Sequence, residues 1–320
     1  MAPGEFDIIA RWFSRGTNRG DVALGVGDDA ALLAPRAGMR IAVAVDTLVG
    51  GVHFDVATPA AAVGHKCLAV NLSDLAAMGA EPAAALLALT LPAADAHWIE
   101  AFAGGLFALA DRYSVALIGG DTTRGPLCIS VTVLGYVAPG RELRRAGARP
   151  GEAIYVTGTP GEAALGLALA QGRIDLSPVL GALAIERLHQ PQPRVATGMA
   201  LRGVASAAID ISDGLCADLG HLLAASGVGA EIDADALPLS PALRAVTPRT
   251  RALEFALAGG DDYELLFTAP PEAVDAAKAA LDAAGVPITR IGTVRAQPGL
   301  VVSGADDSGA RLGAGGFRHF

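Results

Sequence analysis

The sequence predicts an α/β (α+β) protein with two domains. Two observations support this fold class: apolar runs of strand length alternate with longer segments of helical periodicity, and turn signals interrupt the alternation between residues 139 and 151. The chain has 320 residues, which suggests one large or two medium domains, and 52% of them are hydrophobic, enough for a substantial core. We expect an N-terminal mixed sheet with helices over residues 1–140 and a C-terminal α/β domain over residues 150–320.

The first half alternates strands and helices. Residues 59–78 predict an amphipathic helix because apolar side chains recur at about the helical period, and residues 94–112 predict a second helix. The expected strands are 40–45, 83–90, 115–118 and 127–137, and the last of these is expected to close the sheet.

The second half begins after Pro139-Gly140-Arg141 and Arg149-Pro150-Gly151, which are turn signals that place the domain boundary at 140–150. The expected strands are 153–157, 205–211, 228–232, 263–268, 288–294 and 300–302, and the expected helices are 162–171, 215–226 and 271–284. Residues 189–194 are expected to be a Pro-rich connector, and the Gly-rich residues 298–316 mainly a loop. We expect the ligand site to lie between the two domains.

Composition excludes several classes of partner. The net charge of −9 argues against nucleic acid or an anionic membrane as the main partner. Apolar stretches fall short of the ~20 residues that a membrane span needs, and the N-terminus does not resemble a secretory signal, so we expect a cytoplasmic protein. Cys67, Cys128 and Cys216 lack metal-ligand spacing and are expected to be buried thiols in a reducing compartment.

Six segments carry aspartate where an apolar or Gly-rich run ends. They are Gly27-Asp28-Asp29, Val45-Asp46-Thr47, Asn71-Leu72-Ser73-Asp74, Gly119-Gly120-Asp121, Asp210-Ile211-Ser212-Asp213 and Gly259-Gly260-Asp261-Asp262. A carboxylate beside apolar residues is costly unless it is paired, hydrogen-bonded or metal-bound. Only two lysines occur, Lys66 and Lys278, so a P-loop lysine is excluded and several divalent metal ions become the economical explanation.

Each segment alone also has a plain structural explanation. Gly27-Asp28-Asp29 and the two Gly-Gly-Asp segments could be turns, Asp46 could be a solvated strand end, and Ser212 or Asp213 could cap a helix. Asp74 is more informative, because it lies within a predicted helix and shares a face with Asn71. Together, the six segments match a magnesium–polyphosphate site, because magnesium takes single carboxylates from separate segments.

These motifs together resemble the thiamine-monophosphate kinase family of the aminoimidazole ribonucleotide synthetase-like superfamily. The resemblance covers nearly the whole chain, and Asn71-Leu72-Ser73-Asp74-Leu75-Ala76-Ala77-Met78-Gly79 is its most specific part. It implies the two-domain fold of that superfamily. It also implies transfer of the γ-phosphoryl group of ATP to thiamine monophosphate with several Mg²⁺ ions, and a homodimer paired through the N-terminal sheets.

The resemblance also assigns roles to residues. The implied metal ligands are Asp29, Asp46, Asp74, Asp121, Asp210 and Asp213. The implied ATP contacts are Gly120, Asp121, Arg145, Ser212 and Tyr113. The implied contacts to the thiamine substrate are His53, Asp261 and Phe317. Asp121, Asp213 and Arg145 are expected to contribute most directly to catalysis.

Two departures from the family pattern affect these assignments. Ala44 and Val45 stand where the family often has hydroxyl residues, so a metal contact there would use backbone carbonyls. Asp261 replaces the usual glutamate and is one methylene shorter. Two alternatives are another ATP-dependent enzyme of the superfamily and a non-catalytic protein that binds Mg²⁺–nucleotide. The superfamily members with an N-terminal reactive cysteine or a C-terminal cysteine are disfavoured, because neither cysteine is present.

Overall fold

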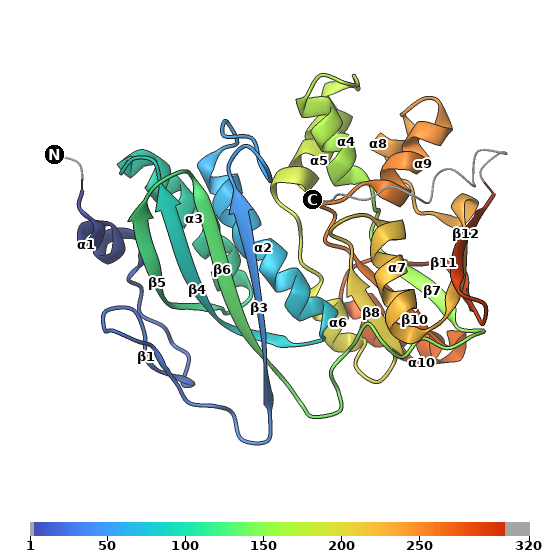
Figure 1. Ribbon diagram of the computed structural model, residues 1–320, viewed down its shortest axis with the longest axis horizontal. Coiled ribbons are helices and arrows are strands. Elements are labelled where there is room, and N and C mark those ends of the chain that lie inside the picture. Colours follow the sequence, from blue (N-terminus) through green and yellow to red (C-terminus); the bar gives the residue numbers. More distant parts are fainter. Residues whose placement is uncertain (1–2, 305–320) are drawn as a thin grey trace. The chain divides into compact units, whose positions relative to one another are not determined.

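The computed structural model describes residues 3–304 and separates into two compact units. Unit 1 contains residues 3–75 and 80–140, and unit 2 contains residues 76–79 and 141–304. Each unit has its own sheet and helices, which confirms the α/β class (Figure 1). No helix within the described residues is both long enough and apolar enough to cross a membrane.

Unit 1 is a four-stranded mixed sheet with two long helices on one face (Figure 1). The strand order is β3-β6-β4-β5, in which only the β4–β5 pair is parallel. The strands are β3 (Arg40–Val49), β4 (Glu81–Leu91), β5 (Ala116–Arg124) and β6 (Cys128–Val137), and the helices are α2 (Ala60–Ala77) and α3 (Ala96–Arg112). The expectation that residues 127–137 close the sheet is wrong, because β6 lies between β3 and β4.

Two glycines allow α2 and α3 to meet at backbone distance. A Cβ on Gly64 would lie 2.0 Å from the carbonyl oxygen of Phe102, and one on Gly105 would lie 1.9 Å from that of Ala61. Because α3 packs this closely on one side and the sheet lies on another, α2 is buried along most of its length rather than on one stripe. The predicted helix is confirmed, but its expected amphipathic character is wrong.

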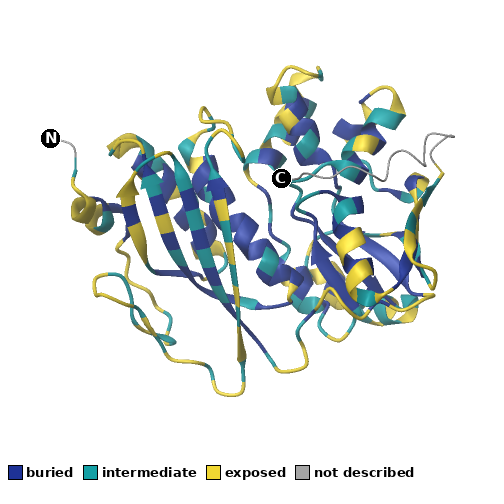
Figure 2. Cartoon of the chain, in the orientation of Figure 1, coloured by how far each residue is buried: buried dark blue, intermediate teal, exposed yellow. Residues whose placement is uncertain are grey.

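The opposite face of this sheet carries exposed apolar side chains. Along β3, Ile41, Val43 and Val45 are 43%, 61% and 60% exposed, and they alternate with partly buried residues (Figure 2). On β6, Ile129, Val131 and Val133 are buried on the helix-covered face, so the alternate residues of that strand line the uncovered one. We call this surface the open face of unit 1.

A short N-terminal region adjoins this sheet. It contains α1 (Glu5–Ile8), a π-helical turn η1 (Ile9–Phe13) and an antiparallel pair, β1 (Val22–Leu24) and β2 (Leu32–Leu33). Two arginines fix the base of the pair: Arg19 contacts Asp21 at 2.6 Å, and Arg36 contacts both Asp21 and Glu81, at 3.3 and 2.9 Å. The hydrogen bond from Arg19 is the main cause that lowers the pKa of Asp21.

Unit 2 is built on a six-stranded sheet of order β12-β9-β11-β7-β10-β8. All neighbours are antiparallel except β12 and β9. Its strands are β7 (Ala153–Thr157), β8 (Ala207–Asp210), β9 (Gly229–Asp233), β10 (Leu265–Ala269), β11 (Ile288–Arg295) and β12 (Gly299–Ser303). Every residue of β7, β8 and β10 is buried, so these strands form the centre of the core.

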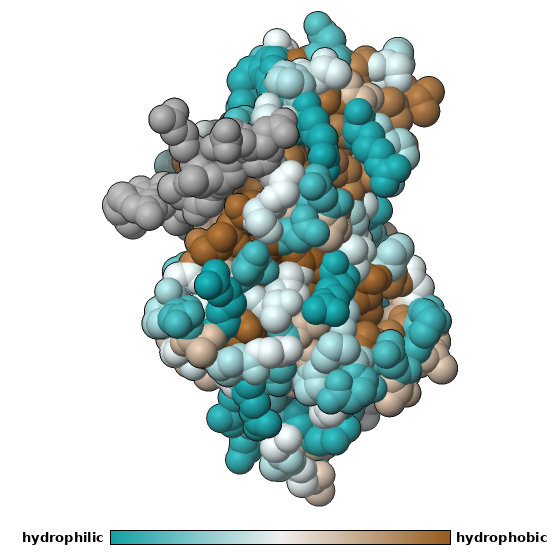
Figure 3. All heavy atoms as spheres, turned by 90° about the vertical axis from the view of Figure 1, so that its right-hand side faces the viewer, coloured by the Kyte–Doolittle hydropathy of each residue, from teal (hydrophilic) through white to brown (hydrophobic). Residues whose placement is uncertain are grey.

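Helices complete unit 2. They are α4 (Glu162–Ala170), α5 (Pro178–His189), α6 (Val195–Ala200), α7 (Leu215–Ser226), the 3₁₀ turn η2 (Ala234–Ala236), α8 (Pro241–Arg244), α9 (Arg249–Ala258) and α10 (Pro271–Ala283). Leu219 and Leu222 of α7 and Leu257 of α9 join the core of the sheet. On the face that Figure 3 presents, hydrophilic and hydrophobic residues intermingle.

Candidate functional site

Asp46 lies inside a strand rather than at its end. β3 continues for three residues beyond Asp46 and pairs with β6 as far as Val49, so the predicted strand end at 45 is wrong. Asp46 shares the parity of the buried Leu48, which places it on the helix-covered face of the sheet. β3 is an edge strand of the sheet, and the backbone N–H of Asp46 donates a hydrogen bond to Asn71 Oδ1 at 2.9 Å.

Asn71 joins this strand to α2. Its side chain is fully buried, and Nδ2 donates to the carbonyl oxygen of Cys67 at 2.9 Å, which fixes the orientation of the amide. Asp74 follows one helical turn later on the same face and is half-buried. Burial raises the pKa of Asp46, and the nearby charge of His53 opposes that shift. His53 Nδ1 in turn accepts the N–H of Val49 at 2.9 Å.

Gly119, Gly120 and Asp121 also lie inside a strand, because β5 extends to Arg124. The predicted strand end at 118 and the alternative of a plain turn are therefore wrong, and the structure gives a different reason for Gly120. Gly120 has φ of 148°, and a Cβ there would lie 1.8 Å from the carbonyl oxygen of Leu87 on β4. Asp121 pairs with Ala88 and is exposed on the open face, opposite to the face that carries Asp46.

The other two predicted residues of unit 1 are near the surface. Asp29 is exposed in the β1–β2 connection, and its N–H donates to Asp28 Oδ1 at 2.9 Å, so Asp28 serves the turn. Tyr113 ends α3 and lies under the guanidinium of Arg112, 5.5 Å from the ring centroid.

In unit 2, the segment from Asp210 to Gly214 connects β8 to α7. Asp210 is the last residue of the strand and is 6% exposed, whereas Ser212 and Asp213 are half-buried. The helix begins at Leu215 after Gly214, and no side chain caps it. The alternative that Ser212 or Asp213 caps the helix is therefore wrong.

The backbone of this connection is held instead by Asp218, in the first turns of α7. Asp218 Oδ2 accepts the N–H groups of Ser212, Asp213 and Gly214 at 3.0, 3.0 and 3.1 Å. Burial, reinforced by the charges of Asp210 and Asp213, raises the pKa of Asp218 to about 7, although the hydrogen bonds from the N–H groups of Asp213 and Gly214 oppose the shift. Asp210 and Asp213 thus lie close enough to Asp218 for their charges to act on it.

A second predicted segment pairs with this connection. Asp261 N–H donates to Ser212 O, and Tyr263 N–H donates to Ile211 O, both at 2.8 Å, while Ile211 N–H donates to Glu264 O at 2.8 Å. Gly260 is required here, because a Cβ would lie 2.4 Å from Ser212 O. Asp261 and Tyr263 have positive φ, and Tyr263 Oη donates to Asp261 Oδ1 at 3.0 Å, which orients the residue predicted to contact substrate.

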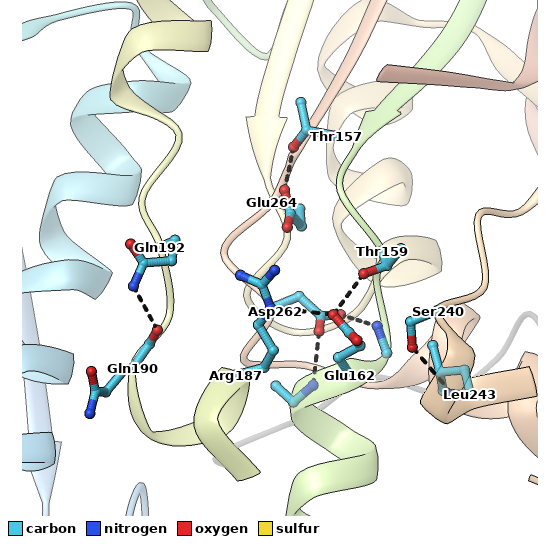
Figure 4. Close-up of polar contacts among 12 residues, drawn as sticks. Thr157, Thr159, Glu162, Arg187, Gln190, Gln192, Ser240, Leu243, Asp262 and Glu264 are labelled. Carbon is cyan, nitrogen blue, oxygen red and sulfur yellow. Dashed lines mark hydrogen bonds and ion pairs between the residues drawn. The ribbon is translucent and has the colours of Figure 1, made fainter. Parts of the chain in front are cut away.

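Asp262 has a structural task in the same segment. Its carboxylate accepts the N–H groups of Gly161 at 2.6 Å and Ala163 at 3.2 Å, at the N-terminal end of α4 (Figure 4). Burial raises the pKa of Asp262 well above its usual range, against the effect of these hydrogen bonds. The sequence assigned Asp262 no ligand role, and its place at the helix end agrees with that assignment.

Glu264 anchors the segment to the sheet. Its Oε2 accepts from Thr157 Oγ1 at 2.6 Å (Figure 4). The same oxygen accepts from Arg194 Nε at 2.6 Å, and Arg194 Nη2 binds the other oxygen. The side chains of Arg194 and Glu264 are only 11% and 6% exposed. The pair is therefore a buried bidentate salt bridge, and the Pro-rich connector that carries Arg194 was not expected to contribute one.

Arg145 lies in a loop that is hydrogen-bonded to Ser226, the last residue of α7. Ser226 Oγ accepts the N–H groups of Gly147 and Ala148 at 3.1 and 3.2 Å and donates to the carbonyl oxygen of Arg145 at 3.2 Å. The side chain of Arg145 itself is exposed.

The predicted aspartate ligands fit magnesium only as single carboxylates, and not as a cluster of protein side chains. Within residues 3–304, no group of three or more His, Cys, Asp or Glu side chains is arranged to hold a metal ion. Single carboxylates do fit an ion that takes its remaining oxygens from phosphates and water, as Mg²⁺ does with nucleotides. Phe317, predicted to contact the substrate, lies outside the described residues.

Sequence reasoning missed Asp218 and Arg194. Asp218 had a usable signal: it is an acid on the apolar face of a predicted helix, between Cys216 and Leu219, and such an acid needs partners. Arg194 had none, because its partner Glu264 is distant in sequence.

Comparison with known proteins decides the family. The AIR synthase related protein N-terminal domain matches residues 27–137, and the corresponding C-terminal domain matches residues 149–304. A thiamine-monophosphate kinase of Salmonella typhimurium is 52% identical over 92% of this chain and 92% of its own. The chain belongs to the thiamine-monophosphate kinase family.

Solved structures agree with membership of the thiamine-monophosphate kinase family. The thiamine-monophosphate kinase of Stenotrophomonas maltophilia K279a has a TM-score of 0.85 and 52% identity, over 90% of this chain and 92% of that one. AaThiL complexed with AMPPCP and TMP has a TM-score of 0.79 and 32% identity, over 90% of this chain and 89% of that one. The predicted superfamily fold is therefore confirmed.

Proposed function

We propose that this chain is an ATP-dependent kinase that transfers the γ-phosphoryl group of ATP to thiamine monophosphate, giving thiamine diphosphate and ADP. The observation that carries the proposal is family membership over almost the full length, at 52% identity to a thiamine-monophosphate kinase. A family structure complexed with AMPPCP and TMP supports the two substrates.

The chemistry needs little from a general base. The acceptor is a phosphate monoester with a second pKa near 6, so it is already an anionic nucleophile at neutral pH. Direct in-line transfer then requires positioning of two anionic phosphates and relief of their repulsion. When bound, magnesium ions would supply that charge neutralisation.

We assign metal, ATP and substrate contacts to residues of both units. Unit 1 contributes metal binding and part of the ATP contact, and unit 2 completes the binding of nucleotide and substrate. The proposed metal ligands are Asp29, Asp46, Asp74, Asp121, Asp210 and Asp213, and they would hold more than one ion, because Asp46 and Asp121 lie on opposite faces of the sheet of unit 1. Gly120, Asp121, Arg145, Ser212 and Tyr113 would contact ATP, and His53, Asp261 and Phe317 would contact the thiamine substrate. The exposed guanidinium of Arg145 is free to approach a phosphate.

Release of ADP tests the proposal directly. Purified protein is incubated with Mg²⁺–ATP and thiamine monophosphate, with free thiamine and other phosphate monoesters as control acceptors. Turnover specific to thiamine monophosphate is expected. Binding of Mg²⁺–ATP with no ADP above background would overturn the kinase function and leave the non-catalytic alternative. Inversion at a chiral γ-phosphorus is expected for direct transfer, and net retention would contradict it.

The proposal includes a homodimer formed through the β3 side of the open face of unit 1, which leaves Asp121 on β5, at the opposite edge of the sheet, outside the contact. The three exposed apolar side chains of β3 support it, because a row of exposed apolar residues on a sheet is typical of an interface. Val43→Lys is expected to shift the mass measured by light scattering toward the monomer. The protein is proposed to act in the cytoplasm, where the three free thiols would remain reduced.

A further inference from the structure

One buried carboxylate organises the segment that carries Ser212 and Asp213. Asp218 is 3% exposed, and a single oxygen, Oδ2, accepts three consecutive backbone N–H groups at 3.0 to 3.1 Å. An oxygen that receives three N–H groups in succession requires the chain to curl around it. Gly214 permits that curl, because its φ of 127° is rarely adopted by other residues.

The other side of the same segment is fixed as well. The carbonyl oxygens of Ile211 and Ser212 accept the N–H groups of Tyr263 and Asp261 at 2.8 Å. The backbone is therefore held on one side by Asp218 and on the other by the segment that carries Asp261. With donors and acceptors both occupied, the backbone shape is set by the protein alone.

This arrangement decides what the segment can offer a nucleotide. Free N–H groups at a strand-to-helix connection commonly bind phosphate. Here those of Ser212, Asp213 and Gly214 are already used by Asp218. The connection can then contribute through the side chains of Ser212 and Asp213, which are half-buried and take no part in these three bonds.

We propose that Asp218 is a positioning residue for phosphoryl transfer, which holds the Ser212–Asp213 backbone so that these two side chains meet Mg²⁺–ATP in a fixed geometry. The inference rests on the proposed kinase function. Asp218 touches no reacting atom, and its effect passes through the three N–H groups. Residues that orient metal ligands in this way typically change metal affinity or activity by about 10- to 100-fold when replaced.

Three substitutions of Asp218 separate the effects of its acceptor oxygen, its charge and the position of that oxygen. Asp218→Val removes the acceptor at similar size, and is expected to raise both the KM for ATP and the Mg²⁺ concentration for half-maximal rate by about 10-fold or more. Asp218→Asn keeps one acceptor oxygen, and because all three bonds go to one atom, it is expected to stay within about 3-fold of wild type in these constants. Asp218→Glu keeps the charge but displaces the oxygen, and is expected to resemble the valine variant.

Asp233→Val is the matched control. Asp233 is also an aspartate of unit 2 that accepts a backbone N–H, from Asp235 at 2.9 Å, but it has no bond to residues 212–214. Its removal is expected to leave the KM for ATP and the Mg²⁺ requirement unchanged. Circular dichroism and thermal melting establish that each variant is folded, and if the valine variant is not, the glutamate variant carries the test.

The outcomes distinguish the proposal from a structural role. If Asp218 only stabilises the fold, its replacement lowers kcat by reducing the amount of folded, active protein, and leaves the KM for ATP and the Mg²⁺ requirement unchanged. That result for Asp218→Val would overturn the inference. So would an asparagine variant as impaired as the valine variant. A wild-type protein without kinase activity would instead overturn the proposed function, because the variants are read only against an active parent.

Discussion

The carboxylates proposed as ligands in unit 1 and three buried carboxylates of unit 2 are held in opposite ways. In unit 1, Asp29 and Asp121 are exposed, and the Asp46 backbone has one side-chain contact, from Asn71. In unit 2, three carboxylates are buried and hold several hydrogen bonds: Asp218 accepts three N–H groups, Asp262 accepts two, and Glu264 is bound by Arg194 and Thr157. The difference teaches that the same residue type is left accessible in one unit, where we propose it binds metal, and forms the internal framework of a loop in the other.

Asp121→Ala in unit 1 gives the largest expected effect, and the effect is on activity alone. The proposed role in charge neutralisation predicts a loss of kcat of about 10²–10³-fold. Because Asp121 is exposed, the free energy of unfolding should change by no more than about 0.5 kcal/mol. Asp111→Ala, an exposed aspartate of the same unit, is the control and should retain full activity. Near wild-type turnover in Asp121→Ala would remove this residue from the site.

Glu264→Gln in unit 2 is expected to act mainly on stability. It leaves Arg194 buried without its countercharge, which should cost about 3–5 kcal/mol in a urea unfolding titration. Lys278→Gln breaks the exposed Lys278–Asp282 pair of the same unit and should cost about 0.5 kcal/mol or less. Equal costs for the two variants would show that unit 2 does not depend on its buried pair.

These contrasts show what could be predicted from sequence. Elements with a clear period were located closely: α7 and β7 have the predicted bounds, and α2 differs by one residue at each end. The misplaced strand ends fall where polar residues or glycines lie within strands. Asp46 and Gly119-Gly120-Asp121 looked like strand ends because these residue types usually mark turns, whereas cross-strand pairing carries both strands through them.

The candidate site was predictable to a similar extent. The Asp210 and Gly259 segments were identified separately, but their mutual backbone bonds depend on a register between β8 and β10 that local patterns do not contain. The sequence also could not show why residue 120 is glycine, because a Cβ there would clash with Leu87 on another strand. The helices α5, α6, α8 and α9 were not predicted.

A pair of glycine substitutions sharpens the comparison within unit 1. Gly120→Ala introduces a Cβ against Leu87 O at a positive φ, and should cost at least about 2 kcal/mol. Gly27→Ala has a similar φ of 126° but open space around the new methyl group, so only backbone strain of about 1 kcal/mol is expected. Thermal melting of both variants measures the difference. A Gly27→Ala variant at least as damaging as Gly120→Ala would contradict the steric explanation.

Thiol reactivity is the smallest expected effect. Cys67 and Cys216 are buried, and burial raises the pKa of Cys67 and raises that of Cys216 to about 11, so little reactive thiolate is present at pH 8. Cys128 is half-exposed, so the expectation that all three thiols are buried is wrong for this residue. Titration with a disulfide reagent should modify Cys128 first, while the slow reaction of Cys216 should rise about tenfold per pH unit below pH 11. Rapid modification of all three native thiols would contradict these placements.

The helix α7 sets the distance between two loops as well as providing a packing surface. Asp218 near one end holds the Ser212 loop, and Ser226 at the other holds the Arg145 loop, so the two anchors are separated by about 12 Å of helix. Adding one residue between them would shift one anchor by about 1.5 Å and rotate it by about 100° relative to the other. The span between two proposed nucleotide contacts is therefore encoded in the number of residues in one helix, which should tolerate substitution between its anchors far better than insertion or deletion.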